Sequence, residues 1–394
     1  MRSVYFSEDH ETFRRSVRDL VESEITPHAE EWEAAQRIPP EIWRRMGELG
    51  FLGIMIPEKW GGSGADVFFA LAFLEELPRS RMGGFTAAVT VQQFIATGAI
   101  LRHGTEEQKR RYLQPSAEGA AVGSISISEP DCGSDVANLR TGATRDGDSW
   151  VIDGAKTWIT NGVYGDFNVV ACRTGPEGAA GISLIVVDRD TPGVRSSKIR
   201  KIGWHSSDTA EITFDHARVP VANLLGRENM GFYYVMETFA IERIAAAATS
   251  VGSCDVILEE TLRYMGERQA FGKSIDRFQA LRHRIADLAS ELEAARQLVY
   301  HAAWLWSRGE QAIRESSMAK LVATELNRRI ADECLQFFGG YGYTEEYPIS
   351  RFFRDARVST IVAGTSEIMR EIIARVVIDR MAFPRIEDLE ATAE

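Results

Sequence analysis

The hydrophobic period of this chain changes twice along its length, and that change constrains the fold more than any single motif does. Over residues 6–118 apolar side chains recur at helical spacing, for example at Phe13, Val17, Leu20 and Val21. Steps of three and four residues place apolar side chains on one face of an α-helix. We predict a helical opening region that ends around Pro115.

Between about 120 and 225 the period becomes two. The stretch 149–160 follows the turn signal Asp146-Gly147, and 167–173 and 182–187 are rich in β-branched and apolar residues. Short strands with frequent turns predict a compact β-barrel or sandwich.

Helices return from about residue 229. Long periodic stretches at 230–265, 278–308 and 312–338 are typical of an antiparallel helix bundle. We therefore expect an α+β multidomain protein with an N-terminal α-helical domain (1–119), a middle β-barrel domain (120–228) and a C-terminal helix bundle (229–394).

Composition narrows the possible partners and compartment. The net charge of -12 disfavours a nucleic-acid binder, because phosphate contacts need clustered Lys and Arg. Neither the four cysteines nor the seven histidines are spaced as metal ligands, so no metal site is predicted. No stretch approaches the roughly 18–20 apolar residues of a membrane span. We expect a cytoplasmic protein, although a mature mitochondrial matrix protein would look the same.

Two segments of the middle region could belong to a binding site. Residues 124–136, S-I-S-I-S-E-P-D-C-G-S-D-V, are either a turn at the entry to the β-domain or a polar cradle for a cofactor. Residues 156–162, K-T-W-I-T-N-G, place Trp158 and Thr160 on one face of a strand. The indole is either part of the core or is presented to a flat aromatic ligand.

Two further segments lie in the C-terminal region. R-Q-A-F-G-K at 268–273, followed by Gln279, could bind a diphosphate or could be a helix end with solvated charges. Q-F-F-G-G-Y-G-Y at 336–343 has glycines that helix termination explains, but termination does not explain the aromatic residues around them. No Rossmann fingerprint, P-loop, zincin motif or nucleophile elbow is present.

A carboxylate stands in an apolar part of the helix at 230–252. Glu242 shares one predicted face with small and apolar residues, namely Val235, Thr238, Phe239, Ala245, Ala246 and Thr249. Burial there would raise the pKa of Glu242 towards neutrality, as a general base requires. The alternative is a surface Glu242 paired with Arg243.

The segment S-T-I-V-A-G-T-S-E-I-M-R at 359–370 contains a break. An apolar run ends at Ala363, Gly364 follows, and a helix is predicted to start around Thr365. Such a gap suggests that something other than the protein's own side chains occupies the space.

Taken together, these motifs resemble the acyl-CoA dehydrogenase family in order and spacing, over nearly the whole chain. The matching segments are S-E-P-x-x-G-S-D at 128–135, W-I-T-N at 158–161, S-S-D-T at 206–209, R-x-x-F-G-K at 268–273, Q-F-F-G-G-Y-G-Y at 336–343, R-D-A-R at 354–357 and G-T-S-E at 364–367. The resemblance implies a C-terminal four-helix bundle, a homotetramer and bound FAD. It places the following residues near the flavin of the same subunit: Ile127, Ser128, Trp158, Thr160, Thr365 and Glu367. It also directs Arg268, Phe271, Gln279, Gln336 and Gly340 to the FAD of a neighbouring subunit, and Ser134 to the CoA.

The family comparison also identifies the predicted base. Many members carry the catalytic Glu immediately before G-T-S, where this chain has Ala363. The isovaleryl-CoA and long-chain branches are similar to this chain, with Ala at that position and Glu before Arg on the earlier helix. The resemblance thus implies Glu242 as catalytic base and Arg243 as an ordering residue. Ala363 would polarise the thioester carbonyl through its N–H, and Gly364 would leave room for the acyl chain.

The implied reaction is FAD-dependent α,β-dehydrogenation of an acyl-CoA thioester to the trans-2-enoyl-CoA, in fatty-acid or branched-chain catabolism. Electrons would pass to an electron-transferring flavoprotein, with Trp158 near the exposed flavin edge. Similarity around Glu242, with residues 86–97 lining the pocket, favours a long- or branched-chain substrate. Two alternatives stay open, namely a dehydrogenase acting on acyl-carrier-protein thioesters and an inactive flavin- or acyl-binding scaffold.

Overall fold

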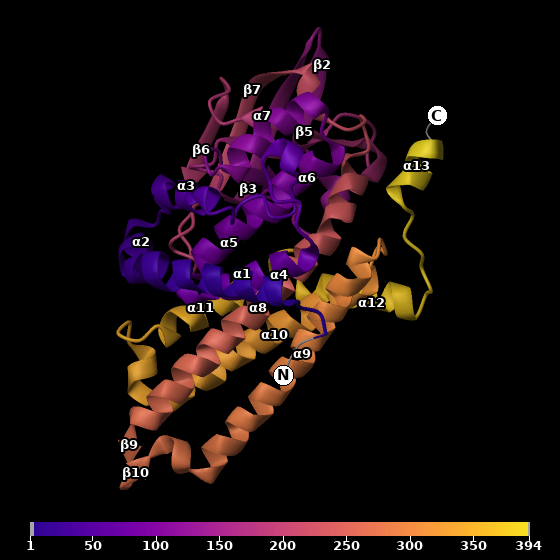
Figure 1. The fold of residues 1–394 in the computed structure, drawn as a ribbon. Coiled ribbons are helices and arrows are strands. Elements are labelled where there is room, and N and C mark those ends of the chain that lie inside the picture. The colour runs from indigo at the N-terminus through magenta and orange to yellow at the C-terminus, as the bar shows by residue number, and fades with distance from the viewer. Residues whose placement is uncertain (1–3, 393–394) are drawn as a thin grey trace.

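Three regions follow one another in the predicted order in the computed structural model, which describes residues 4–392 (Figure 1). The sheet lies at one end of the molecule, the long C-terminal helices lie at the other, and the N-terminal helices pack beside both. The N-terminal helices are α1 (Glu8–Leu20), α2 (Ala29–Ala35), α3 (Pro40–Glu48), α4 (Val67–Glu76), α5 (Gly83–Thr90), α6 (Thr97–His103) and α7 (Glu106–Ala117).

The ends of these helices follow local signals in the sequence. Ser7 caps α1 by accepting the N–H of His10, and Val17 and Leu20 are buried as the periodicity predicts. Helix α7 continues through Pro115 and ends at Ala117, within two residues of the predicted end around Pro115. Pro115 has no N–H to donate to the carbonyl of Arg111, so the last turn of this helix lacks one hydrogen bond.

One segment contradicts the expectation that no stretch is apolar enough to span a membrane. Residues Gly83–His103, which form α5, a π-helical turn and α6, meet the length and hydropathy of such a span, and 78% of the apolar window is buried inside the protein. Its side chains Phe85, Val89 and Ile100 are fully buried. The hydropathy of this segment is thus accounted for by its place in the core.

Eight strands form one sheet in the order β6-β7-β3-β2-β4-β5-β8, with β1 pairing in parallel with β4. The two halves of this sheet are joined where Gly142 of β2 pairs with Arg173 of β4. The strands are β1 (Gly123–Ser126), β2 (Gly142–Asp146), β3 (Ser149–Thr160), β4 (Phe167–Arg173), β5 (Ile182–Asp188), β6 (Val194–Lys198), β7 (Thr209–Pro220) and β8 (Leu224–Leu225).

The two faces of the sheet pack against different cores. Val170 of β4 and Ile185 of β5 point into a core that is shared with Trp150 and Phe214 from the other half of the sheet. Alternate residues such as Val169 pack instead with the N-terminal helices and with α8 (Gly231–Glu267). Residues from both halves thus enclose one apolar interior, as in the predicted barrel.

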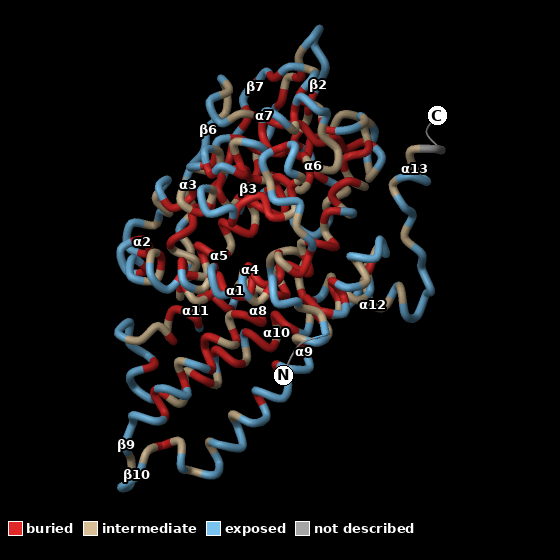
Figure 2. The backbone as a smooth tube through the Cα atoms, viewed as in Figure 1, coloured by how far each residue is buried: buried red, intermediate tan, exposed pale blue. Residues whose placement is uncertain are grey.

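The C-terminal bundle is built around α8 and α10, with buried side chains along their contact (Figure 2). Side-chain contacts between these helices join positions 73 or 74 apart, such as Arg243 with Ser317 and Tyr264 with Phe338, so the two helices run in parallel. Much of α9 is exposed. The remaining elements are β9 (Gln269–Ala270), β10 (Lys273–Ser274), α9 (Gln279–Ser307), α10 (Ile313–Phe338), α11 (Ile349–Ser359), α12 (Ser366–Val377) and α13 (Ile386–Thr392).

Candidate active site

A cavity of about 1430 Å³ lies where the three regions meet. Its walls come from α5, from the sheet, from α8 and from the α11–α12 turn. Ten of the predicted site residues line it: Ile127, Ser128, Ser134, Trp158, Thr160, Glu242, Arg243, Ala363, Gly364 and Thr365. The fold thus brings together residues that are more than 200 positions apart in the chain.

Glu242 enters this cavity as a buried and unpaired carboxylate. Its Oε2 atom is buried and has no hydrogen-bond partner in the described part of the chain. Burial raises the pKa of Glu242 to about 7, although the cations of Arg243 and Lys320 oppose the shift. A carboxyl with this pKa can accept a proton at neutral pH.

The alternative of a surface ion pair between Glu242 and Arg243 does not describe the structure. Arg243 is itself buried, packs over the ring of Phe239 at 5.5 Å, and directs Nη1 to the Ser317 hydroxyl at 3.5 Å. Burial lowers the pKa of Arg243 to about 10. The two neighbouring side chains therefore leave α8 in different directions, as consecutive helical positions do.

Only part of the predicted face around Glu242 lines the cavity. Phe239, Ala246 and Thr249 line the cavity with Glu242, but Val235, Thr238 and Ala245 do not line it and are buried. A stripe of seven positions spans more of the circumference than the cavity does, so its outer members turn into the core on either side.

The turn at Ala363 and Gly364 forms another part of the cavity wall. Both residues have left-handed backbone conformations, with φ of 56° and 85°. A left-handed alanine costs roughly 1–3 kcal/mol and persists only where its surroundings enforce it. The N–H of Ala363 donates to no acceptor among residues 4–392, and is free for a ligand. Thr365 caps α12 by accepting the N–H of Ile368.

Lys320 of α10 is a site residue that the sequence analysis missed. Its side chain is fully buried, and Nζ donates to the Gly364 carbonyl at 2.7 Å. Burial lowers the pKa of Lys320 to about 8, and the nearby Glu242 opposes the shift. A lysine within the apolar run M-A-K-L-V-A was the only available signal. Lys320 thus links the Ala363–Gly364 turn to the carboxylate.

The wall formed by the sheet presents Trp158 to solvent. The β3–β7 register shifts between Lys156 and Ile159, and Trp158 lies in this bulge with φ of 60°. Its side chain is 59% exposed, so it is not a core tryptophan. The N–H of Thr157 donates to the Ser128 carbonyl at 3.0 Å, which joins two of the predicted motifs.

A buried ion pair supports this wall from behind. Nζ of Lys156 donates to the Ile127 carbonyl at 3.0 Å and to Glu129 at 2.8 Å. Glu129 also accepts the backbone N–H groups of Arg140 and Thr141. Burial would raise the pKa of Glu129, but these partners hold it below its usual value. The pair fixes the segment that carries Ile127 and Ser128.

We expect Glu129→Ala to destabilise the protein by about 3–5 kcal/mol, because the substitution leaves Lys156 buried without its counter-ion. Thermal unfolding should show a melting temperature lowered by several degrees. Asp131→Ala is the matched control, because the Asp131 side chain is 82% exposed and pairs only distantly with Arg140. Equal melting temperatures for the two variants would contradict this role of the ion pair.

The residues predicted to reach a neighbouring subunit lie elsewhere. Arg268, Gln336 and Gly340 line a second cavity of about 490 Å³, at the far end of the bundle. Phe271, in the β9–β10 hairpin, is 95% exposed, and Gln279 at the start of α9 is also exposed. None of these five residues lines the large cavity. The single chain therefore does not join them to Trp158 and Ser128.

The two predicted flavin residues at the start of α12 differ in position. Glu367 is 81% exposed and does not line the cavity, whereas Thr365 does.

The C-terminal segment lines the cavity from Phe383 to Leu389, which was not predicted from the sequence. Tyr234 holds this segment by donating to the Glu390 carboxylate at 2.9 Å. Its placement depends on tertiary contacts, which local sequence patterns do not reveal.

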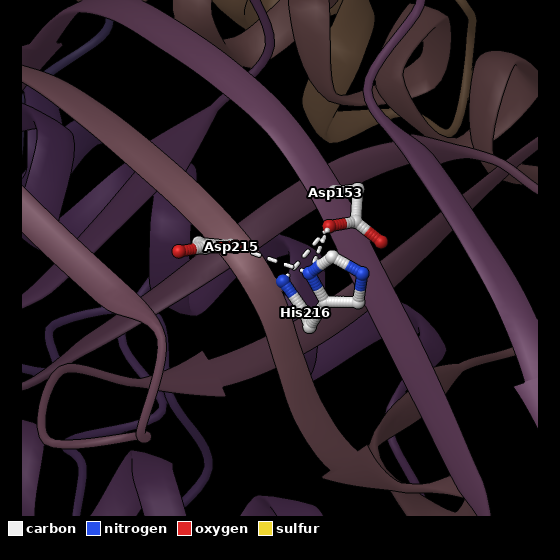
Figure 3. A group of neighbouring side chains, drawn as sticks. All are labelled: Asp153, Asp215 and His216. Atoms are coloured by element: carbon white, nitrogen blue, oxygen red, sulfur yellow. Dashed lines mark hydrogen bonds and ion pairs between the residues drawn. The ribbon is translucent and has the colours of Figure 1, made fainter.

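A separate cluster on the sheet offers three potential metal ligands, Asp153, Asp215 and His216 (Figure 3). All three are exposed, and none lines the large cavity. Nδ1 of His216 lies 3.0 Å from Asp215 and 3.3 Å from Asp153, and these carboxylates raise the pKa of His216. Contacts of His216 with the two carboxylates are sufficient to hold this exposed cluster together.

The residues that line the large cavity fit a flavin in their chemistry. A flat ring system needs an open wall with polar groups at its edge, and the exposed indole of Trp158 beside Thr160 and Ser128 supplies one. The unpaired Oε2 of Glu242 indicates that this atom interacts with a reacting group of a ligand in the same cavity. A carboxyl with a neutral pKa and an open wall with polar groups, together in one cavity, fit a flavin-dependent oxidoreductase.

Comparison with known proteins agrees with this class. The acyl-CoA dehydrogenase N-terminal, middle and C-terminal domain models match residues 7–120, 124–217 and 229–378. The chain therefore belongs to the acyl-CoA dehydrogenase family and is an FAD-dependent enzyme.

Individual relatives cover nearly the whole chain. It is 38% identical to the mitochondrial long-chain specific acyl-CoA dehydrogenase of Sus scrofa, over 95% of this chain and 87% of that one. A crystal structure of an acyl-CoA dehydrogenase from Geobacillus kaustophilus is 41% identical, with a TM-score of 0.93 over 96% of this chain and 100% of that one. A glutaryl-CoA dehydrogenase from Mycobacterium smegmatis, solved with FADH2, is 29% identical, with a TM-score of 0.90 over 96% and 97%.

Proposed function

We propose that this protein oxidises a long- or branched-chain acyl-CoA thioester to the trans-2-enoyl-CoA, with Glu242 as the base. The observation that carries the proposal is the Oε2 atom of Glu242, which is buried and unpaired on a carboxyl with a pKa of about 7. A buried polar atom without a partner costs roughly 1–3 kcal/mol of stability. A role in catalysis explains why the chain carries such a group.

Each wall of the cavity has a part in this reaction. Glu242 takes the proton from the α-carbon of the thioester. The N–H of Ala363 donates to the thioester carbonyl and stabilises the negative charge that develops there. Bound FAD supplies the acceptor for the hydrogen that leaves the β-carbon with its electron pair. The bond between the two carbons thereby becomes a double bond.

Apolar residues form part of the lining of the cavity that holds Glu242. Ile125 lines this cavity, and Phe239 packs beside Arg243. In such surroundings a hydrogen bond from Ala363 is stronger than it is in water. Ile127, Ser128, Trp158, Thr160 and Thr365 would hold the flavin of the same chain, and Ser134 would contact the CoA.

The length of the cavity supports the substrate class. Beyond Glu242, small side chains of α8 continue to line it, at Ala246, Thr249 and Ser253. Thr90 and Val91, from the segment 86–97, line the same cavity. Small residues along α8 leave room for a long or branched acyl chain.

Assembly and electron transfer are part of the same proposal. In a homotetramer, the FAD of a second copy would be met by five exposed residues, and their exposure supports this. They are Arg268, Phe271, Gln279, Gln336 and Gly340.

The exposed Trp158 would face an electron-transferring flavoprotein. A chain 37% identical to this one, with a TM-score of 0.92, comes from a structural study of the electron-transferring flavoprotein of Acidaminococcus fermentans. Bacterial relatives from Bacillus subtilis support a cytoplasmic location.

The test is anaerobic bleaching of the bound flavin by a panel of acyl-CoA thioesters, with the same acyl groups on a carrier protein as the second arm. We expect bleaching by CoA thioesters, fastest with long or branched chains. Bleaching by carrier-protein thioesters alone would favour the biosynthetic alternative. Failure of all thioesters to bleach the flavin would overturn the proposed reaction.

A further inference from the structure

The cavity continues along α8 beyond Glu242. The residues of α8 that line it reach from Phe232 to Ser253, and 11 positions separate Glu242 from Ser253. Over these positions an α-helix advances by about 16 Å. Small side chains along α8 do not by themselves specify a ligand. The polar groups among them that lack a hydrogen-bond partner in the protein indicate what the cavity can bind.

Most hydroxyls along this part of the cavity are already satisfied within their own helices. Thr249 donates to the Ala246 carbonyl at 3.1 Å, and Ser250 donates to the same carbonyl at 2.7 Å. On α5, Thr90 bonds in the same way to its own helix. Ser253 is different, because its hydroxyl has no hydrogen-bond partner among residues 4–392. The distal hydroxyl is therefore available to a ligand.

A buried amide lies at the same height in the bundle as Ser253. Asn327 of α10 is 5% exposed and lines the same cavity. Its Oδ1 is 3.8 Å from Sγ of Cys254, the residue after Ser253, so both polar groups lie at one height in the bundle. Nδ2 of Asn327 donates to no group in the described part of the chain. Nδ2 of this amide is therefore available to donate to an acceptor in the cavity.

We infer that Asn327 and Ser253 bind a hydroxyl group carried by the acyl chain, and that the substrates are long-chain hydroxyacyl thioesters. A hydroxyl can accept from Asn327 and exchange a second hydrogen bond with Ser253. A carboxylate would need a cation, which neither residue supplies. With C–C bonds of about 1.5 Å, an extended chain covers the 16 Å in about a dozen carbons. This inference rests on the proposed function.

The test compares ω-hydroxyacyl-CoAs with plain acyl-CoAs of equal chain length, from roughly ten to eighteen carbons. With native holoenzyme, we expect kcat/KM for the hydroxylated chain to exceed that for the plain chain by about tenfold at one length, since two hydrogen bonds contribute. A ratio at or below one at every length would overturn the inference.

Variants test whether the two hydrogen bonds, and not the shape of the cavity, cause the preference for the hydroxylated chain. Asn327→Leu and Ser253→Ala should each lower the ratio of kcat/KM values about three- to tenfold. Ser250→Ala is the matched control, because that hydroxyl lines the same cavity but is already bonded to Ala246, and it should keep the ratio. A ratio that neither Asn327→Leu nor Ser253→Ala changes would remove these residues from recognition.

Calorimetry distinguishes failure of the site from failure of the proposed reaction. The Glu242→Gln holoenzyme should bind the hydroxylated thioester more tightly than the plain one, without turnover. Tighter binding with no bleaching by any thioester in the native protein would overturn the proposed reaction while supporting the distal site. Equal binding of the two thioesters, with normal bleaching, would overturn the distal site alone.

Discussion

Glu242→Gln is expected to lower kcat for acyl-CoA oxidation by a factor of about 10²–10⁴, because it removes the general base while keeping the shape of the side chain. The bound FAD should be retained, since Glu242 is not among the residues proposed to hold the flavin. Steady-state turnover and the flavin spectrum of the purified variant measure the two effects. Turnover within a few-fold of native would contradict the assignment.

Stability supplies an independent check on the same variant. The folded pKa of Glu242, about 7, is raised above its unfolded value, so the buried charge destabilises the protein increasingly as pH rises from about 4.5 to 7. Above pH 7 the cost is up to about 3 kcal/mol. Glu242→Gln should therefore melt at a higher temperature than native protein at pH 8, and at nearly the same temperature at pH 4.5. A variant that lost activity and melted lower would point to misfolding instead.

Lys320→Met is expected to have the second largest effect. The substitution keeps the apolar stem but removes the donor to the Gly364 carbonyl and the cation near Glu242. We expect kcat to fall about 10- to 100-fold, because the Ala363 N–H loses its support and small misplacements are costly. Loss of a cation also raises the pKa of Glu242, so the pH profile of kcat should move to higher pH.

The shift of the pH profile distinguishes a positioning role of Lys320 from a merely structural one. Arg370→Met is the matched control, since Arg370 is 56% exposed and pairs with Glu325 outside the cavity. It should leave the profile in place. If Lys320→Met lowered kcat at every pH by the same factor, its electrostatic influence on Glu242 would be ruled out.

Long periodic elements could be predicted closely from the sequence. The stretches predicted at 278–308 and 312–338 are α9, Gln279–Ser307, and α10, Ile313–Phe338. Their ends agree because many residues contribute to the period, and α7 ends at Ala117, two residues past the predicted end around Pro115. The apolar segment 83–103 shows the opposite limit, since hydropathy does not distinguish a buried core helix from a membrane span.

The site was predictable where a residue's chemistry conflicts with its local pattern. Glu242 is a charged residue in an apolar stretch, and the Ala363–Gly364 break ends another apolar stretch. Both features could therefore be identified from the sequence. Lys320 acts through a carbonyl 44 positions away, and Phe383 approaches the cavity from a segment without strong periodicity. Such contacts depend on how helices pack, which the sequence of one helix does not determine.

The most direct measurement of Glu242 as the base is the pH dependence of flavin bleaching in a single anaerobic turnover, with native protein and Glu242→Gln compared. We predict a native rate that rises with pH through about 7 and then levels off, as the carboxyl loses its proton. The variant should lose both the rate and this dependence. A native rate that is flat across pH 7, or a variant that bleaches as fast as the native protein, would contradict the assignment of Glu242.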